Sequence, residues 1–221
     1  MIKLIIFDWN GTLFADTIAV MESNNQVLKA LGCQPVNLRQ YRATMKIPAI
    51  DFYGRWGADK QELLKNSKKY SKIFHHYYEP RAKKCRTRAG ARELLIWFKK
   101  HSVESVILSN HTIPGINYQL KRLKIIHDIS HVLANTVISN TISKRNKLER
   151  ARVYLKKKKY KPSEILIIGD SAEEVEIGRK LGIITVAITH GWYSITRLKA
   201  SQPDYLIANL KELIKIVKAV K

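Results

Sequence analysis

The chain has 221 residues, and its 45% apolar and 9% aromatic content is enough to bury a sizeable core in one domain with a small insertion. Forty Lys and Arg residues against eighteen Asp and Glu give a formal net charge of +22, which attracts phosphate-bearing partners. Nucleic acid is a possible partner but is not favoured, because the basic residues are scattered over expected helix surfaces. The cysteine spacing suggests neither a disulfide framework nor a zinc site, and no apolar stretch has the length of a membrane span or signal peptide, so we expect a cytoplasmic protein with no membrane partner.

Four short apolar runs have the β-branched character of strands buried on both faces of a parallel sheet. They are residues 2–7, 103–108, 165–168 and 183–188. Helical patterns lie between them, for example at residues 91–100 and 147–158, and a final helix is expected at 210–220. This alternation predicts an α/β fold with a doubly wound, Rossmann-like parallel sheet, in which ligands bind beyond the carboxyl ends of the strands.

Residues 16–84 interrupt this alternation. They contain helical patterns at 19–31 and 60–78 but no convincing buried strand. We therefore predict two parts: a core domain made of residues 1–15 and 85–221, and an inserted α-helical cap domain made of residues 16–84.

Polar residues follow the predicted strands in an order that resembles the four signatures of the haloacid dehalogenase superfamily. The matching segments are Asp8-Trp9-Asn10-Gly11-Thr12, Ser109-Asn110, a lysine near residue 144, and Gly169-Asp170 with Glu174. The chain looks most like the phosphoglycolate phosphatase branch, whose helical cap is inserted just after the first signature. The resemblance covers essentially the whole chain and implies a Mg²⁺-dependent phosphatase.

In the family pattern, the first aspartate attacks phosphorus, and the matching residue is Asp8. A carboxylate suits this covalent role because it is ionised at neutral pH and forms a labile acyl phosphate. Two residues further on, the family usually has a second aspartate that serves as general acid and base, but this chain has Asn10. An amide cannot exchange protons in that way, and losing such a group typically costs about 10²- to 10⁴-fold in rate.

The resemblance also assigns residues to phosphate binding. Gly11 and Thr12 fit a tight loop whose backbone N–H groups face an anion. Ser109 and Asn110 match the position that holds a phosphoryl oxygen. For the cationic third signature the candidates are Lys144 and Lys147; we favour Lys144, because its spacing before the helix matches the family and Lys147 lies within the helical pattern.

The implied cofactor is Mg²⁺, which prefers hard oxygen ligands. The resemblance implies that Asp8, the backbone carbonyl of Asn10 and Asp170 hold it. Glu174 stands where the branch more often has Asp, which puts a direct contact with the metal in doubt.

Other residues are weaker candidates. His111 follows Ser109 closely enough to be tested as a substitute proton carrier. The basic and aromatic residues expected on cap helices, Arg42, Lys46, Tyr53 and Arg55, are candidates to contact the far end of a substrate.

Three interpretations of function follow. The first is a phosphatase that acts on a small phosphorylated metabolite through an aspartyl-phosphate and is slowed by Asn10. The second is a phosphotransferase. The third is a catalytically silent protein of this fold that binds phosphate or nucleic acid.

Overall fold

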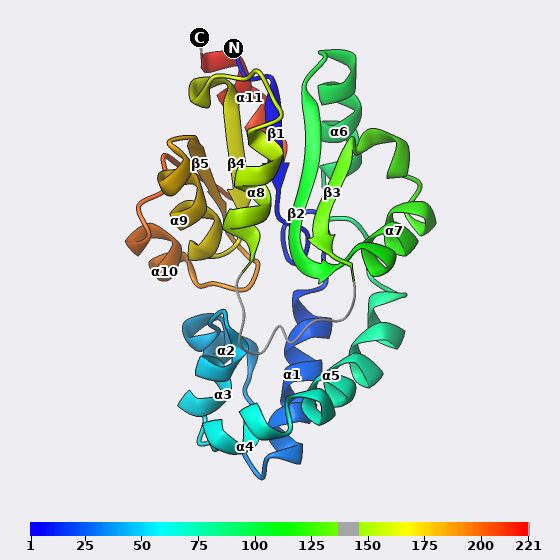
Figure 1. The fold of residues 1–221 in the computed structure, drawn as a ribbon, viewed down its shortest axis with the longest axis vertical. Coiled ribbons are helices and arrows are strands. Elements are labelled where there is room, and N and C mark those ends of the chain that lie inside the picture. The colour runs from blue at the N-terminus through cyan, green and yellow to red at the C-terminus, as the bar shows by residue number, and fades with distance from the viewer. Residues whose placement is uncertain (137–145, 221) are drawn as a thin grey trace.

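The computed structural model describes residues 1–136 and 146–220 and shows one sheet of six parallel strands in the order β3-β2-β1-β4-β5-β6 (Figure 1). The strands are β1 (Leu4–Phe7), β2 (Glu104–Thr112), β3 (His131–Asn135), β4 (Ile165–Gly169), β5 (Ile184–Ile188) and β6 (Tyr205–Ile207). Strand order reverses between β1 and β4, so the predicted doubly wound α/β fold is confirmed, and the ligand crevice of such a sheet lies at the carboxyl ends of these two strands.

Alternating side chains of β1 enter two different cores. Leu4 and Ile6 pack in one cluster, while Ile5 and Phe7 pack in another on the opposite face of the sheet. The first cluster includes residues of α8 (Lys147–Leu155) and α9 (Ala172–Leu181), and the second includes residues of α6 (Ala91–Lys100), α7 (Ile113–Arg122) and α11 (Glu212–Ala219). Helices therefore cover both faces, as the continuous apolar runs require.

Local sequence signals set the start and end of α9, which follows the last predicted loop. The Ser171 side chain accepts the backbone N–H of Glu173 at 3.1 Å, which begins the helix. Gly182 ends it with a φ of +67°. The Ser171 N-cap places the two acidic residues of the first turn of α9, Glu173 and Glu174, beside the end of β4.

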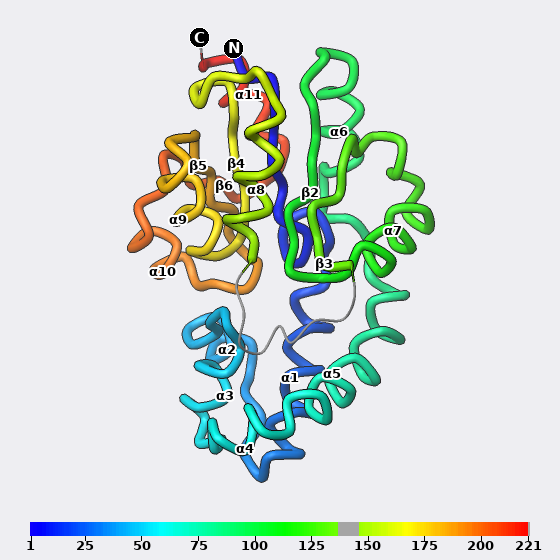
Figure 2. The backbone as a smooth tube through the Cα atoms, in the orientation of Figure 1, coloured from blue at the N-terminus to red at the C-terminus, as the bar shows by residue number. Residues whose placement is uncertain are grey.

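Five helices gather at the carboxyl end of the sheet, opposite the chain termini (Figures 1 and 2). They are α1 (Thr17–Ala30), α2 (Leu38–Thr44), α3 (Ala49–Arg55), α4 (Lys60–Lys65) and α5 (Ser67–Ala82). The helix expected at 60–78 is thus two helices separated at Asn66. This grouping agrees with an insertion of residues 16–84, and its status as an independent domain stays a prediction.

Two edge strands, β3 and β6, were not predicted. Only Ala134 of β3 and Ile207 of β6 are buried, so neither edge strand is buried on both faces as the four central strands are. The remaining short elements are α10 (Ile195–Ala200) and two 3₁₀ turns, Ile126–Asp128 and Pro162–Glu164.

Part of the lysine run before β4 has a packing role. Lys158 Nζ lies 2.8 Å and 2.9 Å from the two carboxylate oxygens of Glu104, which also accept the hydroxyls of Tyr154 and Tyr160. Burial raises the pKa of Glu104, but these bonds outweigh it and hold the pKa below its usual value. None of the helices in the described parts of the chain is both long and apolar enough to span a membrane.

Candidate active site

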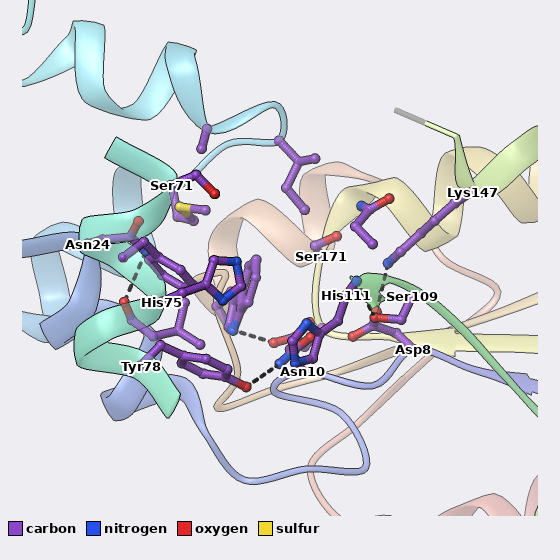
Figure 3. A pocket seen from close by; sticks show the side chains of 18 of the residues that line it. Asp8, Asn10, Asn24, Ser71, His75, Tyr78, Ser109, His111, Lys147 and Ser171 are labelled. Carbon is purple, nitrogen blue, oxygen red and sulfur yellow. Dashed lines mark hydrogen bonds and ion pairs between the residues drawn. The ribbon is translucent and has the colours of Figure 1, made fainter. Parts of the chain in front are cut away.

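A cavity of about 140 Å³ lies between the carboxyl ends of the central strands and the cap helices (Figure 3). Asp8 follows β1 directly, and its backbone N–H donates to Ile168 of the neighbouring strand at 2.9 Å. Ser109 belongs to the end of β2, and Asp170 follows β4. The parallel sheet therefore brings these three residues, which are far apart in sequence, to the inner end of one cavity.

Lys147 forms the ion pair at the centre of this cluster. Its Nζ lies 2.7 Å from Asp8 Oδ1 and 2.6 Å from Glu174 Oε1, and Glu173 is 3.3 Å away. Burial lowers the pKa of Lys147, but the three carboxylates raise it well above its usual value. Lys147 is the first residue of α8, so a position at the start of the helix lets its side chain reach the strand ends. Lys144, which the spacing favoured, lies outside the described residues.

Two aspartates of this site, Asp8 and Asp170, have raised pKa values. Burial raises the pKa of Asp8 to about 7, partly opposed by Lys147. Burial, Asp8 and Glu174 together raise the pKa of Asp170 well above its usual value. Buried carboxylates that repel one another favour a bound cation, which would relieve both the repulsion and the desolvation.

Two glycines shape the surroundings of Asp170. A Cβ added to Gly11 or to Gly191 would lie 2.0 Å from Asp170 Oδ2. Both backbone segments therefore pass the carboxylate at a distance that only glycine permits. The backbone N–H of Trp192 donates to the same oxygen at 2.6 Å. Backbone on several sides thus holds this carboxylate in one position.

The donor set fits Mg²⁺ with few protein ligands. Among the described residues, no group of three or more His, Cys, Asp or Glu side chains is arranged to hold a metal. Mg²⁺ commonly binds through one or two carboxylates, with water and substrate phosphate completing the octahedron, and Asp8 and Asp170 provide such a pair. Both oxygens of Glu174 have partners, Lys147 and the Ser171 hydroxyl at 2.7 Å, so this longer side chain orients the lysine.

Asn10 is held by a hydrogen-bond network that joins the loop after β1 to helix α5 of the insertion. Its Nδ2 donates to Asp16 Oδ2 at 2.6 Å and to the Tyr78 hydroxyl of α5 at 2.9 Å. Tyr78 in turn donates to Asp16 at 2.7 Å. Burial raises the pKa of Asp16 to about 6, although the hydrogen bonds from Asn10 and Tyr78 partly oppose the shift.

The N–H groups predicted to face phosphate are used inside the loop. The Gly11 N–H donates to Phe14 and Asp16, at 2.8 Å and 2.9 Å, and the Thr12 N–H donates to Trp9 at 3.3 Å. The Thr12 hydroxyl is buried without a hydrogen-bond partner and does not line the cavity. Gly11 therefore matters for its close approach to Asp170, and the phosphate contacts expected of Gly11 and Thr12 stay a prediction.

Ser109, Asn110 and His111 all line the cavity from the end of β2. Ser109 Oγ accepts the His111 backbone N–H at 3.1 Å, which keeps its own hydroxyl hydrogen for a ligand. Asn110 Nδ2 donates to Glu173 at 3.2 Å. Burial lowers the pKa of His111 to about 4, so its imidazole is neutral at pH 7 and has no cationic proton to donate.

The four residues of the insertion that were candidates to contact the substrate lie in three different places. Tyr53 lines the cavity. Arg42 instead donates to the backbone carbonyls of His190 and Gly191, at 2.7 Å and 2.9 Å, and so ties the cap to the core. Lys46 and Arg55 line a second pocket that includes neither Asp8 nor Asp170.

Sequence reasoning missed several residues of this site. Arg88 donates to the carbonyl of Gly11 at 2.7 Å and to that of Thr189, and thereby supports the loops on both sides of Asp170. Asp16, Tyr78 and Gly191 were also missed. A polar residue at the start of the insertion was the one available signal for Asp16, whereas the partners of Arg88 and Tyr78 come from distant parts of the chain.

The fold and the acidic cluster define an α/β protein with a buried, lysine-paired carboxylate directly after its central strand β1. The model of the family described as haloacid dehalogenase-like hydrolases matches residues 5–188, and the chain belongs to this family.

Curated relatives and solved structures are similar to this chain over nearly its full length. The phosphoglycolate phosphatase of Synechococcus elongatus is 25% identical, with 97% of both chains covered. That of Photobacterium profundum is 25% identical over 98% of this chain and 96% of its own. A haloacid dehalogenase-like hydrolase from Streptococcus pneumoniae has the same fold, with a TM-score of 0.80 at 21% identity and 97% and 98% of the two chains covered.

Proposed function

We propose that the protein is a Mg²⁺-dependent phosphatase that hydrolyses a small phosphate monoester through an aspartyl-phosphate on Asp8. The observation that carries the proposal is the buried contact of Lys147 with Asp8 and Glu174 at the inner end of the cavity. A buried cation beside a carboxylate nucleophile is suited to neutralise the charge that gathers when a dianionic phosphate approaches. The named activity of the similar phosphoglycolate phosphatases supports the same reaction.

In the first step, a carboxylate oxygen of Asp8 attacks phosphorus and the bond to the leaving alcohol breaks. Lys147 holds Oδ1 of Asp8, and among the described residues no hydrogen bond is made to Oδ2. Ser109 donates its hydroxyl to a phosphoryl oxygen. In the second step, water attacks the phosphorus, inorganic phosphate leaves and the Asp8 carboxylate is regenerated.

Asp8, Asp170 and the Asn10 carbonyl are the groups that would hold Mg²⁺. When bound, Mg²⁺ supplies positive charge that draws the phosphate toward the carboxylate and stabilises the charge of the transition state. The raised pKa values of Asp8 and Asp170 support this assignment, since a bound cation would offset the burial and the mutual repulsion that raise them.

The presence of Asn10 predicts that both steps of the reaction are slow, to an extent that depends on the leaving group of the substrate. Its side chain cannot give a proton to the leaving oxygen, so substrates with good leaving groups should react fastest. It also cannot activate the attacking water, so the phosphoenzyme should accumulate. His111 lines the same cavity and is the candidate base for the attacking water, while its lowered pKa leaves it no cationic proton for the leaving oxygen.

The test is Mg²⁺-dependent phosphate release from a panel of small monoesters and acetyl phosphate, in the wild type and in Asp8→Asn. We expect release that requires both Mg²⁺ and Asp8. Transfer to an added alcohol that exceeds hydrolysis would identify a phosphotransferase. No release, together with ligand binding that falls steeply with salt and ignores Mg²⁺, would support the silent binding protein instead.

A further inference from the structure

The far end of the cavity, which the cap helices form, has a different character from the end that contains Asp8. Its side chains come from α1, α5 and the α2–α3 region. Apolar and aromatic members predominate: Val20, Met45, Ile47, Tyr53 and Phe74. Figure 3 shows this cap side facing Asp8 and Lys147 across the cavity. A substrate that places its phosphate beside Asp8 therefore directs its leaving group toward apolar surface.

Most of the polar groups at this far end already have hydrogen-bond partners within the protein. The Tyr53 hydroxyl donates to Asn24 Oδ1 at 2.5 Å, and Asn24 Nδ2 donates to the carbonyl of Val20 at 3.0 Å. His75, which also lines the cavity, has its Nδ1 3.1 Å from a carboxylate oxygen of Glu79. A polar or charged leaving group would have to break the bonds of Tyr53 and Asn24 to use these two side chains as partners.

The three basic cap residues considered above do not line the cavity. Arg42 is bonded to backbone carbonyls, and Lys46 and Arg55 line the second pocket. Lys147 is the one Lys or Arg among the described lining residues, and it lies at the phosphoryl end between Asp8 and Glu174. A carboxylate on the leaving group would therefore lose its hydration without gaining a Lys or Arg partner at the far end among these residues.

The cavity has room for a small substrate. Its volume of about 140 Å³ is close to that of an engineered protein cavity of about 150 Å³ that binds benzene. A phosphoryl group and a few carbon atoms fill such a space.

We infer that the leaving group of the substrate is a small, uncharged and mainly apolar alcohol, and that a carboxylate-bearing substrate such as phosphoglycolate is disfavoured. This inference rests on the proposed function, because it takes the Asp8 end of the cavity as the phosphate site. The net charge of +22 favours the more negative ligand at long range, so a preference for the neutral one has to come from the local surface.

The test compares the binding of two unreactive analogues of similar length by calorimetry in the presence of Mg²⁺, at about 0.15 M ionic strength, where long-range attraction is screened. Butylphosphonate has an apolar end, 3-phosphonopropionate has a carboxylate, and inorganic phosphate is the reference. We expect butylphosphonate to bind at least about tenfold more tightly than 3-phosphonopropionate.

Two variants show whether the cap surface causes the preference. Ile47→Lys adds a cation to the cavity lining and should shift the ratio toward 3-phosphonopropionate by about tenfold. Leu64→Lys adds the same charge to an exposed position of α4 that does not line the cavity, and should leave the ratio unchanged.

Equal or tighter binding of 3-phosphonopropionate by the wild type would overturn the inference and leave the phosphatase proposal standing. The same holds if inorganic phosphate binds as tightly as butylphosphonate, because the apolar end would then contribute nothing. If none of the three ligands binds, the phosphate site itself is wrong, and the proposed function fails together with the inference.

Discussion

Replacing Asn10 by aspartate should create a carboxyl pair that shares one proton. The new oxygen would lie where Asn10 Nδ2 lies now, 2.6 Å from Asp16 Oδ2. Two like charges at this distance repel by about 6 kcal/mol at an effective dielectric constant of about 20, so they cannot both ionise at neutral pH. Burial already raises the pKa of Asp16 to about 6 with a hydrogen-bond donor beside it, and loss of that donor raises it further.

A proton held at this position at pH 7 is what a general acid needs. We expect Asn10→Asp to hydrolyse a monoester with a poor leaving group about 10²-fold faster than the wild type, at the lower end of the usual range for such a group. Acetyl phosphate, whose leaving group needs no proton, should gain less than about tenfold. Initial rates of phosphate release on the two substrates provide the comparison.

The charge pair should also alter stability in a defined direction. A carboxyl whose pKa is raised on folding is most stabilising at low pH, and that contribution is lost as pH rises through the folded-state pKa. Asn10→Asp should therefore melt closest to the wild type near pH 5 and furthest below it near pH 8.

The double variant Asn10→Asp with Asp16→Asn is the matched control. It exchanges donor and acceptor, so it keeps one carboxylate and one amide at the same separation. It should recover stability at pH 8 and be faster than the wild type on the poor leaving group. If both variants fold and neither is faster on that substrate, Asn10 is not the position that limits turnover.

Three further outcomes follow from the structure. Lys147→Ala leaves buried carboxylates without their cation, so the metal-free variant should lose about 3–5 kcal/mol of stability in urea titration and all measurable turnover, whereas Lys144→Ala should stay active; equal inactivation by both would contradict this choice of lysine. Gly191→Ala would put a Cβ 2.0 Å from an oxygen of Asp170, so calorimetry should show Mg²⁺ binding weakened by about tenfold or more, and unchanged affinity would count against the metal site. Glu104→Gln should cost about 1–2 kcal/mol at pH 7, since the lowered pKa of Glu104 stabilises the fold above pH 4.5; the difference from the wild type should shrink as pH falls below that value, and a constant difference would show that charge is not the cause.

The central strands could be predicted from the chain because both of their faces are buried. Ile5 and Ile6 enter opposite cores, so every position is apolar and the run is visible in the sequence. The edge strands β3 and β6 bury little of their surface and carry no such signal. The same logic predicted Asp8, Ser109 and Asp170, since parallel strands end at one edge of the sheet.

The rest of the site depends on side-chain direction and on contacts between distant segments. Lys144 was favoured over Lys147 because a helical position seemed unsuitable, but the first residue of a helix can still reach the strand ends. The Asn10–Asp16–Tyr78 network joins residues 62 and 68 positions apart, and sequence spacing carries no information about such a contact.

The most direct test of the account is to look for phosphate on Asp8. Wild type mixed with acetyl phosphate and Mg²⁺ is quenched in acid within the first turnovers, and the peptide that contains Asp8 is examined by mass spectrometry. Because Asn10 should slow the second step more than the first, we predict that this peptide carries one phosphoryl group, that the modification requires Mg²⁺, and that Asp8→Asn abolishes it. Phosphate release that is undiminished in Asp8→Asn, with no modified peptide in the wild type, would contradict the covalent mechanism.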